Sequence, residues 1–342
     1  MMFKKIKIVF VLLVISLILI GGSGYLYYVV IKAPFIEEPF NLYIGKNITD
    51  PQIMGEIAEH SKSNRFDIFK MLTSRQKMLE NKKNGAYVFN GDESMIDIYR
   101  KITRGLQTPV KITFNNIRTN EEFVERISEQ LMMDKDSLQK IFDDGVYAKE
   151  YGLDQATFST IFLPDTYEFY WTISPESFVK RMKKEHDAFW SDSRINKAKS
   201  LGVTPLQLAT IASIAEEETN DPYERGVVGR LYLNRVSRGM PLQADPTVKY
   251  ALGDFSIRRV LFEHLKIDSP YNTYKNAGLP PGPIRFASKQ TIDAILNSKP
   301  HKYLYMCAKE DFSGLHNFAT TLTQHNINAA KYRRELNRRK IK

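Results

Sequence analysis

Cysteines and recognisable metal motifs are scarce in this sequence of 342 residues. The single cysteine, Cys307, excludes an intrachain disulfide and any metal site built from several cysteines. The sequence contains no glycine-rich phosphate loop and no HExxH pattern, and its six histidines are scattered. Metal catalysis is therefore unsupported, and we expect neither a metal nor a cofactor.

A long apolar run opens the chain. Residues 8–31 are almost wholly apolar and follow three lysines within residues 1–7. A run of this length can cross a bilayer as a helix, and the tyrosines that follow its glycine-rich stretch fit an interfacial aromatic belt. A cleavable signal peptide is the alternative. Because the lysines come first, we predict a single-pass anchor in the inner (plasma) membrane, with residues 1–7 cytoplasmic and an extracytoplasmic (periplasmic) body.

The composition is that of a basic protein with room for two domains beyond the anchor. The net charge is +10, and 43% of the residues are hydrophobic. A positive balance suits a membrane surface, an acidic wall polymer or nucleic acid. Because the predicted topology places the body outside the cytoplasm, we expect no nucleic-acid partner.

The segment after the anchor reads as a small α+β module. Patterns of apolar residues predict a strand near 41–44, helices over 50–61 and 65–80, and a strand at 85–89. A helix over 93–104, a strand at 110–114 and helices over 121–132 and 134–142 follow. We place this module and its connecting segment at residues 40–150.

A helix is predicted to begin after Thr204, where Thr204 suits the N-cap and Pro205 the first helical position. Its apolar residues Leu208, Ile211 and Ala215 share one stripe and should be buried.

Three consecutive glutamates end this helix. At about 100° per residue, Glu218 returns to the apolar stripe, whereas Glu216 and Glu217 point sideways or outward. Burial and the negative end of the helix dipole should raise the pKa of Glu218, and such a carboxyl group can act as a general acid at neutral pH. The alternative is a solvated run of glutamates at a fraying helix end.

Aromatic and turn-rich segments surround this helix in the sequence. Residues 162–170 fit either a core strand or the wall of a sugar-binding cleft, and a single long helix is expected from Ser174 to about Leu201. Prolines and glycines stiffen the loops at 269–274 and 278–284, as is common around a site. We expect 162–170 and 243–250 to line one cleft with Glu218.

Together these motifs resemble the endolytic murein transglycosylase family, called YceG-like or MltG. The matching stretches are FxPDTYxF at 162–169, ASIAEEET at 212–219, NR at 234–235, LQADPTVKY at 242–250, SPYNTY at 269–274, GLPPGPI at 278–284 and HNF at 316–318. The resemblance implies an α+β fold: a transmembrane helix at 8–31, a LysM-like module within 40–150 and a catalytic domain over 155–342.

The resemblance also implies roles for individual residues. Glu218, directly before the threonine of the E-x-E-T motif, would be the catalytic residue. Asp165 and Asp245 are candidates for a second carboxylate, although both lie in proline-flanked turns. The implied substrate-binding residues are Asp165, Tyr167, Asn234, Gln243, Asp245, Tyr271, Asn272, Thr273, Tyr274 and Asn317.

The implied reaction cleaves the β-1,4 bond between N-acetylmuramic acid and N-acetylglucosamine in nascent peptidoglycan. Glu218 would protonate the glycosidic oxygen and then take the proton of the muramic C6 hydroxyl, which closes a 1,6-anhydro ring. The enzyme would terminate or trim glycan polymerisation beside peptidoglycan synthases (penicillin-binding proteins) of the elongation or division machinery. The alternatives are a non-catalytic, membrane-anchored wall-binding scaffold and a muramidase that uses water and a second carboxylate.

Overall fold

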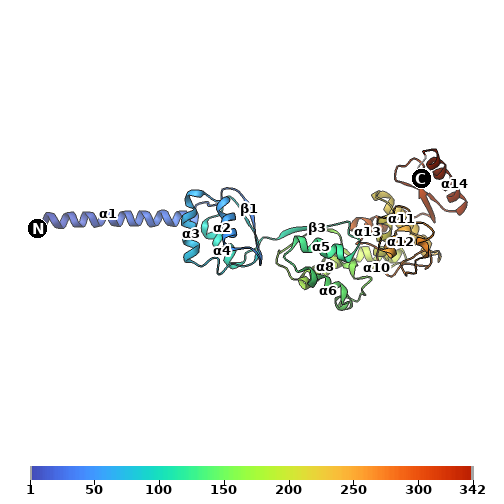
Figure 1. Ribbon diagram of the computed structural model, residues 1–342, viewed down its shortest axis with the longest axis horizontal. Coiled ribbons are helices and arrows are strands. Elements are labelled where there is room, and N and C mark those ends of the chain that lie inside the picture. Colours follow the sequence, from blue (N-terminus) through green and yellow to red (C-terminus); the bar gives the residue numbers. More distant parts are fainter. Residues whose placement is uncertain (1, 340–342) are drawn as a thin grey trace. The chain divides into compact units, whose positions relative to one another are not determined.

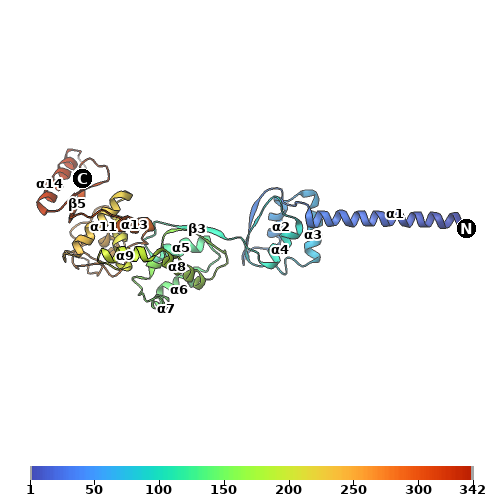
Figure 2. The same cartoon turned by 180° about the vertical axis from the view of Figure 1, so that it is seen from behind.

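The protein, described here by a computed structural model covering residues 2–339, is a mixed α+β chain with an N-terminal helix (Figure 1, and from behind in Figure 2). It divides into two compact units. The first runs to Ile112 and includes Glu168–Ile173; the second contains Thr113–Tyr167 and the chain from Ser174 onward. The predicted α+β fold class with an apolar N-terminal helix is confirmed.

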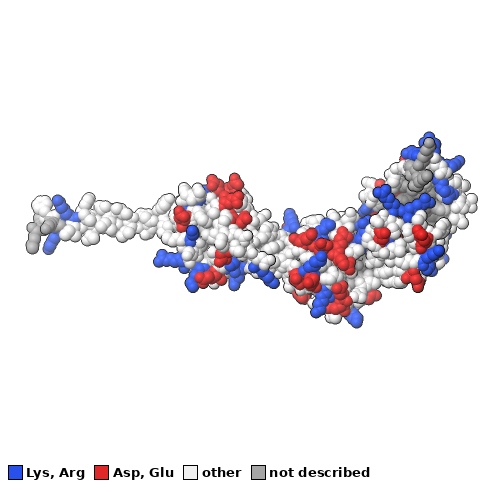
Figure 3. All heavy atoms as spheres, in the orientation of Figure 1, with Lys and Arg blue, Asp and Glu red and all other residues white. Residues whose placement is uncertain are grey.

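The N-terminal helix α1 (Met2–Tyr27) continues into a short π-helix, η1 (Tyr28–Lys32). The helical stretch Lys5–Lys32 contains an apolar window with a mean hydropathy of 2.6, and the protein buries none of this window. Figure 3 shows no charged side chains along the helix after the lysines at its start. Because its apolar side chains have no cover from the rest of the chain, α1 fits a single-pass membrane anchor.

The first unit has the predicted strand–helix–helix–strand order. It contains β1 (Phe40–Ile44), α2 (Asp50–Glu59), α3 (Phe66–Arg75), β2 (Gly85–Phe89) and α4 (Met95–Arg104). β1 pairs antiparallel with β2, with Phe40 opposite Phe89 and Ile44 opposite Gly85. Alternate residues of β1 are buried, so one face of the small sheet packs against the helices of this unit.

The strands β3 (Val110–Phe114) and β4 (Asp165–Phe169) form a two-stranded sheet, and each contributes residues to both units. The helices α5 (Asn120–Gln130), α6 (Lys135–Asp143) and α7 (Val146–Glu150) belong to the second unit. The unit boundary thus lies at Ile112 instead of near 150, because aromatic packing draws 113–150 into the second unit. The ring of Phe123 stacks on that of Phe286, with 4.8 Å between their centroids.

The remaining elements of the second unit are mostly helices. They include α8 (Pro175–Phe189), α9 (Asp192–Ser200), α10 (Pro205–Glu218), α11 (Pro222–Val236), α12 (Asp245–Leu252), α13 (Lys289–Leu296), β5 (Tyr305–Ala308), β6 (His316–Ala319) and α14 (Leu322–Arg338). The single long helix expected after Ser174 is wrong. Trp190 turns into the core and Ser191 starts a new helix, so the chain breaks between α8 and α9.

Helix α10 is the centre of the second unit. It packs against α9, α11, α12 and α13, and the predicted burial of Leu208, Ile211 and Ala215 is confirmed. Helices α11 and α13 approach each other closely at Gly226, where an added Cβ would lie 2.6 Å from the carbonyl oxygen of Ala294. Helix α10 therefore packs against two helices that are themselves in close contact.

Candidate active site

Glu218, the last residue of α10, opens into a cavity of about 410 Å³ in the second unit. Helix α11 contributes Tyr232 and Arg235 to its wall, α12 contributes Asp245, and β6 contributes His316. The other lining residues are Leu231, Leu242, Gln243, Tyr274, Tyr305, Met306, Cys307, Ala308, Leu322 and His325. The cavity is therefore built from segments far apart in the sequence, around one helix end.

The carboxyl group of Glu218 is in an environment that favours its protonated form. Burial raises the pKa of Glu218 to about 7, and the nearby charge of Asp245 adds to the rise. The Tyr232 hydroxyl donates a 2.6 Å hydrogen bond to Glu218 Oε1, which acts in the opposite direction because it favours the carboxylate. A carboxyl group with this pKa can both donate and accept a proton near neutral pH.

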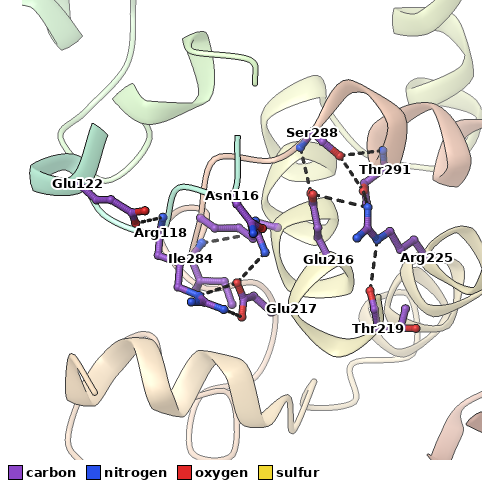
Figure 4. Close-up of polar contacts among 12 residues, drawn as sticks. Asn116, Arg118, Glu122, Glu216, Glu217, Thr219, Arg225, Ile284, Ser288 and Thr291 are labelled. Carbon is purple, nitrogen blue, oxygen red and sulfur yellow. Dashed lines mark hydrogen bonds and ion pairs between the residues drawn. The ribbon is translucent and has the colours of Figure 1, made fainter. Parts of the chain in front are cut away.

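The two preceding glutamates are occupied by structural contacts (Figure 4). Glu216 is buried; it accepts a 3.0 Å hydrogen bond from the Ser288 backbone N–H and lies 3.7 Å from Arg225. Glu217 accepts hydrogen bonds of 2.8 and 3.1 Å from Arg118 and one of 2.7 Å from Arg285. The expectation that Glu216 points away from the buried surface is wrong.

The reason lies in how α10 is covered. All residues from Leu208 to Glu216 are buried, because neighbouring helices surround the middle of α10. A helix buried on all sides has no solvated face for the flanking glutamates. The arginines that bind Glu217 lie 99 and 68 residues away in the sequence, and local periodicity gives no information about such partners.

Three of the sequence-predicted binding residues share the cavity with Glu218: Gln243, Asp245 and Tyr274. Tyr274 donates a 2.5 Å hydrogen bond from its hydroxyl to Asp245 Oδ1. Gln243 has a φ of +49°, and its side-chain oxygen accepts a 2.6 Å hydrogen bond from Arg235. These contacts fix the orientation of polar groups on the wall facing Glu218.

Four other predicted residues do not line the cavity and instead make contacts within the protein. Thr273 is buried and accepts a 3.1 Å hydrogen bond from the Ala244 backbone N–H. Asn272 is buried and donates to two backbone carbonyls at 2.9 Å, and Asn234 donates to the carbonyls of His301 and Tyr303. Tyr271 packs against Tyr250, with 4.8 Å between ring centroids. Their amide and hydroxyl groups hold loops instead of lining the cavity.

The remaining three predicted residues lie elsewhere in the unit. Asp165 pairs with Lys289 at 2.7 Å, beside a separate hollow of about 420 Å³. Tyr167 is buried and donates a 2.6 Å hydrogen bond to the Leu163 carbonyl. Asn317 donates to Glu310 at 2.8 Å. The expectation that 162–170 lines the Glu218 cavity is wrong, because rings such as Phe162 are buried and pack against Phe123 instead.

Tyr232, Arg235 and His316 line the cavity although they are not among the residues predicted from the sequence. Tyr232 is buried within α11, and its hydroxyl reaches Glu218. Arg235 and His316 lie in the NR and HNF motifs, directly beside the predicted residues Asn234 and Asn317. Because neighbours on a strand face opposite sides, His316 lines the cavity and Asn317 does not.

The described residues 2–339 offer one group of side chains close enough to share a cation. Glu56, Glu59 and His60, at the end of α2, have ligand atoms within 4.8 Å of one another. Both glutamates are exposed, and the group belongs to the first unit, outside the Glu218 cavity.

Residues 42–331 match the YceG-like family. An endolytic murein transglycosylase of Bacillus subtilis (strain 168) is 29% identical over an alignment of 337 positions, and the match covers 92% of this chain and 91% of the relative. One of Streptococcus pneumoniae serotype 2 is 32% identical over 173 residues, 49% of this chain and 31% of that protein. The crystal structure of a yceG-like protein from Listeria monocytogenes superposes with a TM-score of 0.56 and 28% identity, covering 85% of this chain and 98% of that one.

Proposed function

The chain belongs to the YceG-like family, and from this premise we propose that it is an endolytic murein transglycosylase, a lyase that cleaves peptidoglycan glycan strands. The relatives' names support this activity. The observation that carries the proposal is the state of Glu218: a carboxyl group with a pKa of about 7, at the wall of a cavity of about 410 Å³.

In the first step Glu218 acts as a general acid. Its protonated carboxyl group donates to the oxygen of the MurNAc-β-1,4-GlcNAc bond, and the bond between that oxygen and C1 of the muramic residue breaks. Positive charge develops on this sugar, and the carboxylate formed on Glu218 would stabilise it electrostatically. The Tyr232 hydroxyl favours this carboxylate, because its 2.6 Å hydrogen bond is strongest to the ionised form.

In the second step the same carboxylate acts as a general base. It takes the proton of the muramic C6 hydroxyl while that oxygen bonds to C1, which gives a 1,6-anhydro end and restores protonated Glu218. An internal nucleophile has the entropic advantage of an intramolecular reaction. One carboxyl group is sufficient for both steps, so the residues committed to structural contacts, Glu216 and Glu217, are not needed as acids or bases.

A water-using muramidase is the second candidate, and Asp245 is the observation that favours it. Asp245 lies in the same cavity as Glu218 and contributes to its raised pKa. A second carboxylate could activate water on the opposite face of the sugar. However, Asp245 Oδ1 already accepts the short hydrogen bond from Tyr274, so this oxygen is engaged within the protein.

Product analysis separates these candidates. The purified protein is incubated with isolated sacculi and with uncrosslinked glycan strands, and the fragments are identified by mass spectrometry. The proposed reaction cuts within strands and leaves fragments with anhydromuramic ends. Hydrolysis leaves fragments with reducing ends, which are heavier by the mass of one water molecule. Reducing ends alone would replace the proposal with the muramidase, and intact strands would replace it with a wall-binding scaffold.

The hydrogen bond from Tyr232 gives a prediction on the pH profile. In Tyr232→Phe the carboxylate of Glu218 loses a donor that stabilises it, so its pKa should rise further and the basic limb of the kcat/KM profile should move to higher pH. The maximal rate should fall by about 2–10-fold, the value of one hydrogen bond. A basic limb that stays in place or moves to lower pH would show that Tyr232 does not control Glu218.

The apolar helix and the early lysines support a proposal on location. We propose that the N-terminus is cytoplasmic and that both units are extracytoplasmic. The enzyme would then cut nascent strands where they emerge at the membrane and terminate or trim their polymerisation, beside penicillin-binding proteins of the elongation or division machinery.

A reporter fusion tests the orientation. Alkaline phosphatase fused after Lys342 should be active, and a cytoplasm-dependent reporter at the same position inactive, with the fusion full length and in the membrane fraction. The reverse pattern would invert the topology, and a shortened soluble fusion would indicate a cleaved signal peptide.

A further inference from the structure

His316 is a cavity residue whose contacts leave one ring nitrogen available. It is the first residue of β6, and its side chain is 14% exposed. It lines the same cavity as Glu218. The reaction proposed above gives His316 no task, so its place on this wall needs a separate explanation.

One carboxylate holds the histidine in place. Glu224 Oε2 lies 2.9 Å from His316 Nδ1, and Glu224 Oε1 accepts a 2.8 Å hydrogen bond from the His316 backbone N–H. Because an ionised carboxylate only accepts hydrogen bonds, Nδ1 must carry the proton in this contact. The ring is thereby fixed in both orientation and tautomer.

Glu224 is itself anchored to the end of α10. It lies in the first turn of α11, where a carboxylate is favoured by the helix dipole. The hydroxyl of Thr219, the residue directly after Glu218, donates to Glu224 Oε2 at 3.3 Å. The same carboxylate therefore connects the end of the helix that carries Glu218 to the histidine on β6.

We propose that His316 is a second substrate-contacting residue of the cavity and that Glu224 is its positioning residue. With Nδ1 bonded to Glu224, Nε2 is the remaining polar atom of the ring, and no residue within 2–339 forms a hydrogen bond with it. In a neutral ring with its proton on Nδ1, Nε2 is a hydrogen-bond acceptor. It suits a sugar hydroxyl or an acetamido N–H of a glycan bound across Glu218, and this assignment rests on the glycan substrate of the proposed function.

Binding to a protein that cannot cleave tests this directly. Every variant is made in the full-length Glu218→Gln background, and the Kd of a soluble, uncrosslinked GlcNAc–MurNAc tetrasaccharide is measured by calorimetry. His316→Asn keeps a donor near Nδ1 but has no atom at Nε2; His316→Gln places an amide near Nε2; Glu224→Gln weakens the hold on the ring. His186→Asn is the matched control, because His186 also pairs with a carboxylate, at 3.1 Å, but lies outside the cavity.

His316→Asn should weaken binding by about 3–10-fold, the value of one hydrogen bond. His316→Gln should recover part of this lost affinity. The affinity of Glu224→Gln should lie between those of His316→Asn and the Glu218→Gln parent. His186→Asn should bind as tightly as the parent. Thermal melts verify folding, and the two Gln variants carry the test if His316→Asn unfolds. Parental affinity in all folded His316 and Glu224 variants would overturn the proposal. Absence of cleavage by the wild-type chain would overturn the proposed function instead, and it is read from a separate assay.

Discussion

Glu218→Gln is expected to reduce glycan cleavage by about 10²–10⁴-fold while the protein stays folded and still binds glycan. Gln has the shape of Glu and can accept the hydrogen bond from Tyr232, but it cannot deliver a proton to the glycosidic oxygen. Because one group serves as both acid and base, no other side chain takes over either step. The rate is measured as anhydromuramic ends released from sacculi by the purified variant.

Glu217→Gln is the matched control, the same chemical change one residue earlier on α10. Glu217 is bound by Arg118 and Arg285, outside the cavity. Substantial activity should remain, within about tenfold of the wild type, with lower thermal stability because two arginines lose their charged partner. An inactive Glu217→Gln beside an active Glu218→Gln would contradict the assignment of the acid.

The second large effect concerns stability against pH. The pKa of Glu218 is raised from 4.5 to about 7 in the folded protein, so the folded state holds this proton more tightly than the unfolded chain does. The group's favourable contribution is complete below about pH 4.5 and is lost as the pH rises through about 7. At about 1.4 kcal/mol per pKa unit, the loss is roughly 3 kcal/mol.

Glu218→Gln carries no charge at any pH and should therefore escape this loss. Between pH 4.5 and 8 its free energy of unfolding should rise by roughly 3 kcal/mol relative to the wild type, measured by denaturant unfolding at both pH values. Glu217→Gln should instead be less stable than the wild type at pH 8. If both variants were equally stabilised at pH 8, the gain in the free energy of unfolding would come from the lower net charge of the helix end and not from the burial of Glu218.

The sequence predicted the local elements well because local signals determine them. Strands β2 and β3 have the expected bounds, and α10 begins after the expected Thr204 cap with Pro205 at its first position. The position of Glu218 followed from helical periodicity, since its direction depends on residues within two turns. Such features depend on residues close together in the chain, so a single sequence is sufficient to predict them.

What the sequence could not predict depends on distant partners. The break between α8 and α9 follows from the burial of Trp190, and the burial of Glu216 follows from Ser288 and Arg225. The 162–170 segment has the composition of a sugar-binding wall, yet Phe162 packs against Phe123 and Tyr167 stacks on Phe114. A sugar-binding wall and a buried aromatic core have the same composition, and only the packing in three dimensions distinguishes them.

The protonation of Glu218 is the centre of this account, and its titration is the most direct measurement. The full-length chain in detergent micelles is labelled with ¹³C at the glutamate carboxyl carbons, and comparison with Glu218→Gln identifies the Glu218 signal. We predict a titration midpoint near 7, well above the ordinary value of 4.5. A midpoint near 4.5 would mean that Glu218 is ionised at neutral pH, which would contradict its role as the acid that opens the glycosidic bond.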